Sequence, residues 1–240
     1  MTRGGLAQTD LQELNSFHHS CPRRSSALIK LQNPLPPEKS ADQQATPTQT
    51  KTGSGTSISY ADIVRISLFA ALIAVLGLIP KFDLPFTAGV PITAQTLGVM
   101  LAGLVLGGRN GAMAVLLFLF VVALGAPVLS GGRGGLGVFF GPTVGFLLGW
   151  IAGALVCGVV YRVLKEWMPD RIFLSALLAC LVGGVLTIYA FGIPGLSLVA
   201  KMETSAAALA TLAFLPGDIL KSVIAAWLVT KLSPAVVSKI

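Results

Sequence analysis

Residues 134–161 read GGLGVFFGPTVGFLLGWIAGALVCGVVY, and this stretch between Arg133 and Arg162 contains no Asp, Glu, Lys or Arg. An α-helix rises about 1.5 Å per residue, so it needs about 20 residues to cross the hydrocarbon core of a bilayer. The stretch is longer than that. It also lacks the alternation of apolar and polar residues that marks the strands of a membrane barrel. It therefore predicts a membrane-spanning helix.

The chain beyond about residue 58 repeats this pattern. Residues 84–108, 110–132 and 172–200 also lack charged side chains. Residues 63–80, after Asp62, carry only Arg65, and residues 204–230 are interrupted only by Asp218 and Lys221. We therefore expect an all-α membrane protein with six transmembrane helices. The expected spans are approximately 62–80, 91–107, 111–126, 140–162, 172–192 and 213–232, with loops after Pro80, Gly107, Ala126, Arg162 and Gly192.

The composition agrees with a lipid environment. Hydrophobic residues make up 54% of the chain and charged residues 11%, against about 25% charged residues in a soluble domain. The formal net charge is +7. The basic residues are scattered between the apolar stretches and form no patch, so we expect no nucleic-acid partner.

The basic residues also predict an orientation. One set of loops and ends carries Arg65, Arg109, Arg162, Lys165, Arg171, Lys231 and Lys239, and the opposite set carries Lys81, Arg133 and Lys201. Cytoplasmic loops carry the excess of Lys and Arg. The first set, and with it both termini, is therefore expected in the cytoplasm.

The sixth span contains a helix breaker, Leu215-Pro216-Gly217. In one interpretation the helix starts at Pro216, where the missing N–H costs nothing, and residues 204–214 form a separate short helix. In the other, residues 204–232 form one long kinked helix. We favour the first.

Residues 1–57 are rich in polar residues and proline and carry no sustained apolar periodicity. Such a segment buries too little to offset its ordering entropy. We therefore divide the chain into a disordered tail, 1–57, and a membrane domain, 58–240. His18 and His19 lie in this tail near Cys21, but we expect no metal site.

Two groups of residues stand out as candidates for ligand binding. Asp218 and Lys221 are three apart, share a helix face and lie at or near membrane depth, where charged groups usually face an interior site. The alternative is an ion pair that only neutralises itself. Arg133 is surrounded by five glycines in residues 131–137, so its loop either folds over an anionic ligand or is a flexible surface loop.

Further polar and small residues carry weaker signals. Thr93, Gln95 and Thr96 open the second span, where they either reach a cavity or bond neighbouring helices. Tyr189, late in the fifth span, is either a pocket residue or an interfacial anchor. Ala70 and Ala74 form a small-residue pair that permits close helix contact, with another subunit or within the bundle.

Catalysis has little support in the sequence. The chain has no G-x-x-x-x-G-K-[ST] motif, and both of its histidines lie in the tail. An intramembrane enzyme would need a second catalytic group beside Asp218, and none stands out. We therefore expect a protein that is not an enzyme and has no cofactor.

Three motifs together resemble the BioY family, the biotin-specific substrate-binding (S) components of energy-coupling factor (ECF) transporters. They are Pro91-Ile92-Thr93-Ala94-Gln95-Thr96-Leu97-Gly98-Val99 with Leu101-Ala102-Gly103; Gly125-Ala126-Pro127-Val128 with the glycine-rich loop and Gly141-Pro142-Thr143-Val144-Gly145; and Phe214-Leu215-Pro216-Gly217-Asp218-Ile219-Leu220-Lys221. The resemblance covers about residues 60–232. At Ile193-Pro194-Gly195 the chain departs from it, because the family often has Trp in the place of Gly195.

The resemblance implies a six-helix protein that binds biotin near the outer face of the plasma (inner) membrane; an organelle envelope is the alternative location. Asp218 and Lys221 fall on the functional acid and base of the family, and Arg133 falls in its glycine-rich loop. Together with Gln95 and Tyr189, the candidates from the second and fifth spans, they form the substrate site that we expect. Ala70 and Ala74 would meet a transmembrane coupling subunit, which joins two ATPase subunits. Other interpretations are an S component for another small vitamin, a proton-coupled secondary transporter and a membrane scaffold without a ligand.

Overall fold

The computed structural model describes residues 59–79 and 93–232. The predicted tail 1–57, the predicted loop after Pro80 with Lys81, the start of the first motif at Pro91, and residues 233–240 with Lys239 lie outside the described residues. The helices are α1 (Tyr60–Leu76), α2 (Gln95–Ala123), the 3-10 helix η1 (Leu136–Phe140), α3 (Val144–Trp167), α4 (Ile172–Ala179), the π-helix η2 (Cys180–Thr187), α5 (Ile188–Ala200), α6 (Thr204–Leu212) and α7 (Leu215–Lys231).

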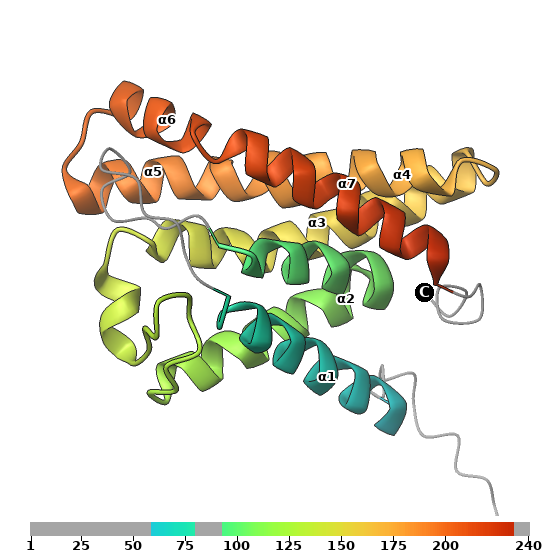
Figure 1. Cartoon of the computed structure of the whole chain (residues 1–240), viewed down its shortest axis with the longest axis horizontal. Coiled ribbons are helices and arrows are strands. Elements are labelled where there is room, and N and C mark those ends of the chain that lie inside the picture. The colour runs from blue at the N-terminus through green and yellow to red at the C-terminus, as the bar shows by residue number, and fades with distance from the viewer. Residues whose placement is uncertain (1–58, 80–92, 233–240) are drawn as a thin grey trace, which may run out of the picture. The chain divides into compact units, whose positions relative to one another are not determined.

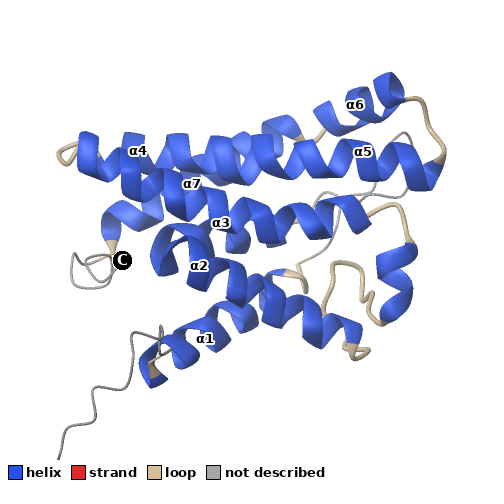
Figure 2. Ribbon diagram, turned by 180° about the vertical axis from the view of Figure 1, so that it is seen from behind, coloured by secondary structure: helices blue, strands red, loops and turns tan. Residues whose placement is uncertain are grey.

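The described part of the chain is all-α, as predicted. Its only strand-like pairing is one isolated bridge between Leu129 and Arg133, and Figure 2 shows helices and loops throughout. Three helical stretches, Gln95–Ala123, Val144–Trp167 and Ile172–Ala200, are long and apolar enough to cross a membrane. The bent pair Thr204–Leu212 and Leu215–Lys231 is a fourth if it forms one span.

The stretch Gln95–Ala123 reverses direction at Gly107, where the loop between two spans was predicted. Gly107 has φ 81° and ψ 169°, a conformation that glycine adopts without steric cost. A Cβ added at Gly111 would lie 2.8 Å from the carbonyl oxygen of Ala102, although residues nine apart in a straight helix are separated by about 13.5 Å. Residues 95–106 and 108–123 are therefore the two limbs of a helical hairpin, which Figure 1 shows in green.

Helix α3 lies at the centre of the helical unit, between α2 on one side and α4, η2 and α5 on the other (Figure 1). It continues past Arg162, where a loop was predicted, to Trp167. Lys165 and Glu166 in this extension are good helix formers, so the charge at Arg162 does not end the helix.

The predicted loop after Gly192 is wrong. The helix that starts at Ile172 continues through η2 and α5 to Ala200, with Pro194 inside it. Proline removes one backbone hydrogen bond, but apolar helices packed on neighbours tolerate it. The helix ends instead at Lys201, whose left-handed conformation has φ 52°.

The end of the chain follows the favoured interpretation. Helices α6 and α7 are separate and meet at an angle of 50°. Helix α7 starts at Leu215 with Pro216 in its first turn, where its missing N–H costs nothing. The break places Asp218 in the first turn of α7.

Ala70 faces the inside of the bundle. It is buried in the same apolar cluster as Ile73 and Val99, and Ala74 packs against that cluster. The structure therefore shows Ala70 in contact with other helices of the bundle. Contact of Ala70 and Ala74 with a coupling subunit stays a prediction.

Candidate functional site

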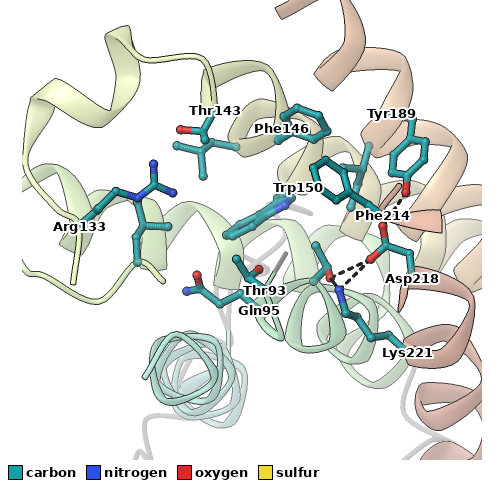
Figure 3. Close-up of a pocket in the computed structure, with 14 residues that line it drawn as sticks. Thr93, Gln95, Arg133, Thr143, Phe146, Trp150, Tyr189, Phe214, Asp218 and Lys221 are labelled. Carbon is teal, nitrogen blue, oxygen red and sulfur yellow. Dashed lines mark hydrogen bonds and ion pairs between the residues drawn. The ribbon is translucent and has the colours of Figure 1, made fainter. Parts of the chain in front are cut away.

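A pocket lies where α2, α3, α5 and α7 meet the glycine-rich loop (Figure 3). It contains about 570 Å³ of space free of protein atoms, a volume that includes space open to the solvent. All five residues predicted for the substrate site line it. The full lining is Thr93, Gln95, Thr96, Leu129, Arg133, Thr143, Phe146, Leu147, Trp150, Ile188, Tyr189, Phe214, Asp218 and Lys221.

A hydrogen-bonded cluster centred on Asp218 occupies one end of the pocket. The Lys221 ammonium donates to Asp218 Oδ1 at 2.9 Å, and the Tyr189 hydroxyl donates to Asp218 Oδ2 at 2.7 Å. Lys221 also donates to Thr96 Oγ1 at 3.1 Å, and Thr96 lies 3.5 Å from Asp218 Oδ1. Asp218 is only 5% exposed, so these donors replace the water that a buried carboxylate needs.

The helix breaks explain how these side chains meet. Asp218 lies in the first turn of α7, where the positive end of the helix dipole favours a carboxylate. Lys221 is three residues further and shares its face. Tyr189 is the second residue after η2, and from this position its hydroxyl reaches Asp218 on α7.

Arg133 approaches from the glycine-rich loop. The loop reverses through the bridge between Leu129 and Arg133, with Gly131 at φ 82° and Gly132 at φ 68°, conformations that favour glycine. The Arg133 Nε donates to the carbonyl of Ser130 at 3.4 Å. In Figure 3, Trp150 lies between Arg133 on one side and Asp218 with Lys221 on the other.

Gln95 acts as a clamp as much as a wall of the pocket. Its amide nitrogen donates to the carbonyl oxygens of Ile73 and Val128, both at 3.2 Å, and its Oε1 accepts from the Ser130 N–H at 3.0 Å. It is fully buried. Since an amide has two donors and two acceptor sites, three of its four are already used. Gln95 therefore ties α1 and the glycine-rich loop to the start of α2.

We expect Gln95→Leu to destabilise the protein by about 2–4 kcal/mol, because it leaves the Val128 carbonyl and the buried Ser130 N–H without partners and removes one of the two donors to the Ile73 carbonyl, which also accepts from Gly77. Thermal unfolding in detergent measures this. The control is Thr230→Val, which removes an exposed hydrogen bond to the carbonyl of Trp227 and should change stability by less than about 0.5 kcal/mol. Equal stability of the two variants would contradict the clamp.

The middle of the pocket is apolar and was largely missed from the sequence. Trp150, Phe146 and Phe214 line it, with Phe146 and Phe214 edge to face at a centroid distance of 6.3 Å. In the sequence these residues look like the aromatic residues of any buried core. Only the reversal of the chain at residues 129–133 and the break before α7 distinguish them as residues of a pocket. Phe214 and Thr143 do lie within the motifs quoted above.

The departure at Gly195 has a packing explanation. A Cβ at Gly195 would lie 2.5 Å from the Cα of Gly145. The two glycines let α3 and α5 cross with their backbones in contact, as small residues do in membrane helix pairs. A tryptophan does not fit at this position unless the two helices separate.

The arrangement suits a small ligand that is polar at both ends and apolar between them. The Asp218 cluster offers a carboxylate acceptor beside ammonium and hydroxyl donors, and Arg133 offers a guanidinium that can bind an anion through two hydrogen bonds. The described residues hold no group of three or more His, Cys, Asp and Glu side chains that could bind a metal.

Comparison with known proteins agrees with this geometry. The family model described as "BioY family" matches residues 48–238. The chain is 50% identical over 173 residues to "Biotin transporter BioY" of Rhizobium etli, which covers 71% of this chain and 92% of that protein. It is 47% identical over 172 residues to "Biotin transporter BioY" of Rhodobacter capsulatus, covering 68% and 88%.

A solved structure is also similar. It is a crystal structure of the S-component for biotin from an ECF-type ABC transporter, with a TM-score of 0.67 and 30% sequence identity. The match covers 71% of this chain and 89% of the other. The chain therefore belongs to the BioY family.

Proposed function

We propose that this chain takes up biotin as the membrane-embedded substrate-binding component of an ECF-type transporter. The observation that carries the proposal is the pocket, with the buried Asp218 cluster at one end and Arg133 at the other. Membership of the BioY family supports it.

The polar groups of biotin match the two ends. Its ureido ring has two N–H donors and one carbonyl acceptor, its second ring and tail are apolar, and it ends in a carboxylate. We assign the ureido ring to the Asp218 end, because Asp218 accepts N–H donors, while Lys221 uses two of its three N–H donors on Asp218 and Thr96 and can offer the third to the carbonyl. Trp150 and Phe146 then cover the apolar part.

We assign the biotin carboxylate to Arg133. Lys221 is already paired with Asp218 at 2.9 Å, and a second carboxylate beside Asp218 would be repelled. Arg133 is separated from that acid by Trp150 (Figure 3), and a guanidinium binds a carboxylate through two hydrogen bonds.

We expect Arg133→Gln to weaken biotin binding about tenfold to a hundredfold, the usual size of a lost charge-assisted hydrogen bond. Biotin amide, in which a carboxamide replaces the carboxylate, should bind the wild-type protein more weakly than biotin does. The dissociation constants of the variant for biotin and for its amide should differ by no more than about threefold, because the interaction that distinguishes the two ligands is absent from the variant. Titration calorimetry gives the four constants, and a variant that still prefers biotin as strongly as the wild type would contradict the assignment.

The fold supports six spans with both termini in the cytoplasm. In this proposal α1, the two limbs of α2, α3, the helix Ile172–Ala200 and the bent pair α6–α7 are the six crossings. The start of α4 and the end of α7 lie at one end of the bundle, and the turn between α5 and α6 lies at the other (Figure 1). The first end carries the basic excess, so the pocket opens to the outside.

Transport needs partners in this proposal. The chain has no G-x-x-x-x-G-K-[ST] motif, so in this proposal ATP hydrolysis belongs to two ATPase subunits joined through a transmembrane coupling subunit. The plasma membrane is the location that fits uptake. Ala70 and Ala74 remain the proposed contact with the coupling subunit, and α1 would have to turn or shift for the buried Ala70 to reach it.

A further inference from the structure

A second cavity lies at the opposite end of the helical hairpin from the biotin pocket. It is formed where the reversal at Gly107 and Gly108 meets the last turns of α3. Gly158 makes this approach so close that a Cβ there would collide with the backbone nitrogen of Gly108. Arg109 and Arg162 line the cavity together with Asn110.

The two arginines give this cavity a strong positive charge. Within residues 59–79 and 93–232, neither Arg109 nor Arg162 forms an ion pair or a hydrogen bond with another side chain. The carboxylate one turn from Arg162 is Glu166, and it is not paired with that arginine. Two guanidiniums beside a cavity without a paired acid attract an anion with a compact charge, such as a phosphate group.

The surface next to the cavity is apolar in the direction of the membrane interior. Leu155, Val159 and Arg162 follow each other at intervals of four and three residues, so they share one face of α3. Leu155 and Val159 are 44% and 46% exposed, and both line the cavity. An aliphatic track of about 10 Å therefore leads away from the charged end.

An exposed tryptophan marks the depth of this site. Trp167, five residues beyond Arg162 at the end of α3, is 80% exposed. Tryptophan gathers at the level of the lipid headgroups. Arg162 therefore lies close to the interface, where a headgroup phosphate is within reach, and the aliphatic track lies at the depth of acyl chains.

We propose that Arg109 and Arg162 form a binding site for the phosphate of an anionic phospholipid, with an acyl chain along Leu155 and Val159. The aliphatic track favours a lipid over free phosphate as the source of that group. In the orientation proposed above, the site faces the cytoplasmic leaflet, where anionic lipids attract basic residues. The site is independent of the biotin pocket.

The test is lipid binding to the purified full-length protein, counted by native mass spectrometry during titration with phosphatidylglycerol or phosphatidylcholine. We expect one tightly bound phosphatidylglycerol and no equivalent site for phosphatidylcholine. The double variant R109Q/R162Q should bind phosphatidylglycerol about 30-fold more weakly, the effect of two basic residues near an anionic surface. The control R171Q/K231Q removes the same charge outside the cavity and should bind as the wild type does.

Several outcomes would overturn the proposal. These are unchanged lipid affinity in R109Q/R162Q, an equal loss in the control, or displacement of the lipid by inorganic phosphate at the same concentration. A double variant that keeps its lipid but no longer assembles with the coupling subunit would make the cavity a protein interface instead. Biotin binding by R109Q/R162Q should stay at the wild-type level, which shows that the variant is folded.

Discussion

Replacing Asp218 with Asn is expected to weaken biotin binding about 30-fold to several thousandfold, the range seen when one partner of a buried charge pair is removed. The amide keeps the shape but turns one acceptor oxygen into a donor. That donor faces either the Lys221 ammonium or the Tyr189 hydroxyl, which now donate to Asp218 at 2.9 Å and 2.7 Å. A ureido N–H then loses its charged acceptor.

A ligand-side control separates this contact from general damage. Biotin that is methylated on a ureido nitrogen should bind the wild-type protein poorly and should lose much less than biotin on going to Asp218→Asn. Asp62→Asn is the matched variant, because that acid pairs with Arg65 at 3.9 Å on the outside of α1. It should leave the dissociation constant unchanged. Equal losses for both ligands in Asp218→Asn would mean that Asp218 holds the fold and does not touch the ureido ring.

Replacing Gly158 with Ala is expected to lower stability by about 3 kcal/mol, at the upper end of overpacking effects. Its Cβ would collide with the backbone of Gly108 and lie 2.5 Å from the carbonyl carbon of Gly107. Backbone atoms cannot move aside as a flexible side chain can, so the hairpin must separate from α3. The apparent Tm should fall by about 6–12 °C for a chain of this size.

Gly137 is the matched control for this substitution. A Cβ there meets no atom within 4 Å, so Gly137→Ala should shift the apparent Tm by no more than about 2 °C. The measurement is a thermal unfolding curve of each protein in the same detergent. Similar curves for Gly158→Ala and the wild type would contradict the close packing of the hairpin against α3.

The membrane helices were predictable because their signal is local. A long apolar stretch can form few structures other than a membrane-spanning helix. Gly107 and Pro216 interrupt such stretches, because glycine and proline change the backbone conformation directly. Pro194 misled the same reasoning. Whether proline ends a membrane helix depends on whether neighbouring helices compensate for the lost hydrogen bond. The sequence around Gly192 does not indicate which helices pack there.

The pocket was predictable only in its polar residues. Asp218 and Lys221 stand out because charge is rare at membrane depth, and Arg133 stands out because five glycines surround it. The structure brings all three to one cavity. Trp150 and Phe146 carry no such signal, since an aromatic residue suits any core position. Gln95 stands out in the sequence as a polar residue at the start of an apolar span, but its three hydrogen bonds to Ile73, Val128 and Ser130 depend on contacts that are distant in sequence.

Titration calorimetry of biotin against the purified full-length chain, run beside Asp218→Asn, tests the central claim most directly. We predict one biotin per chain, bound tightly enough for a near-stoichiometric titration, and a large loss of affinity in the variant. An absence of binding heat from protein that gel filtration shows to be folded, or equal affinity in the two proteins, would contradict the claim that the Asp218 pocket binds biotin.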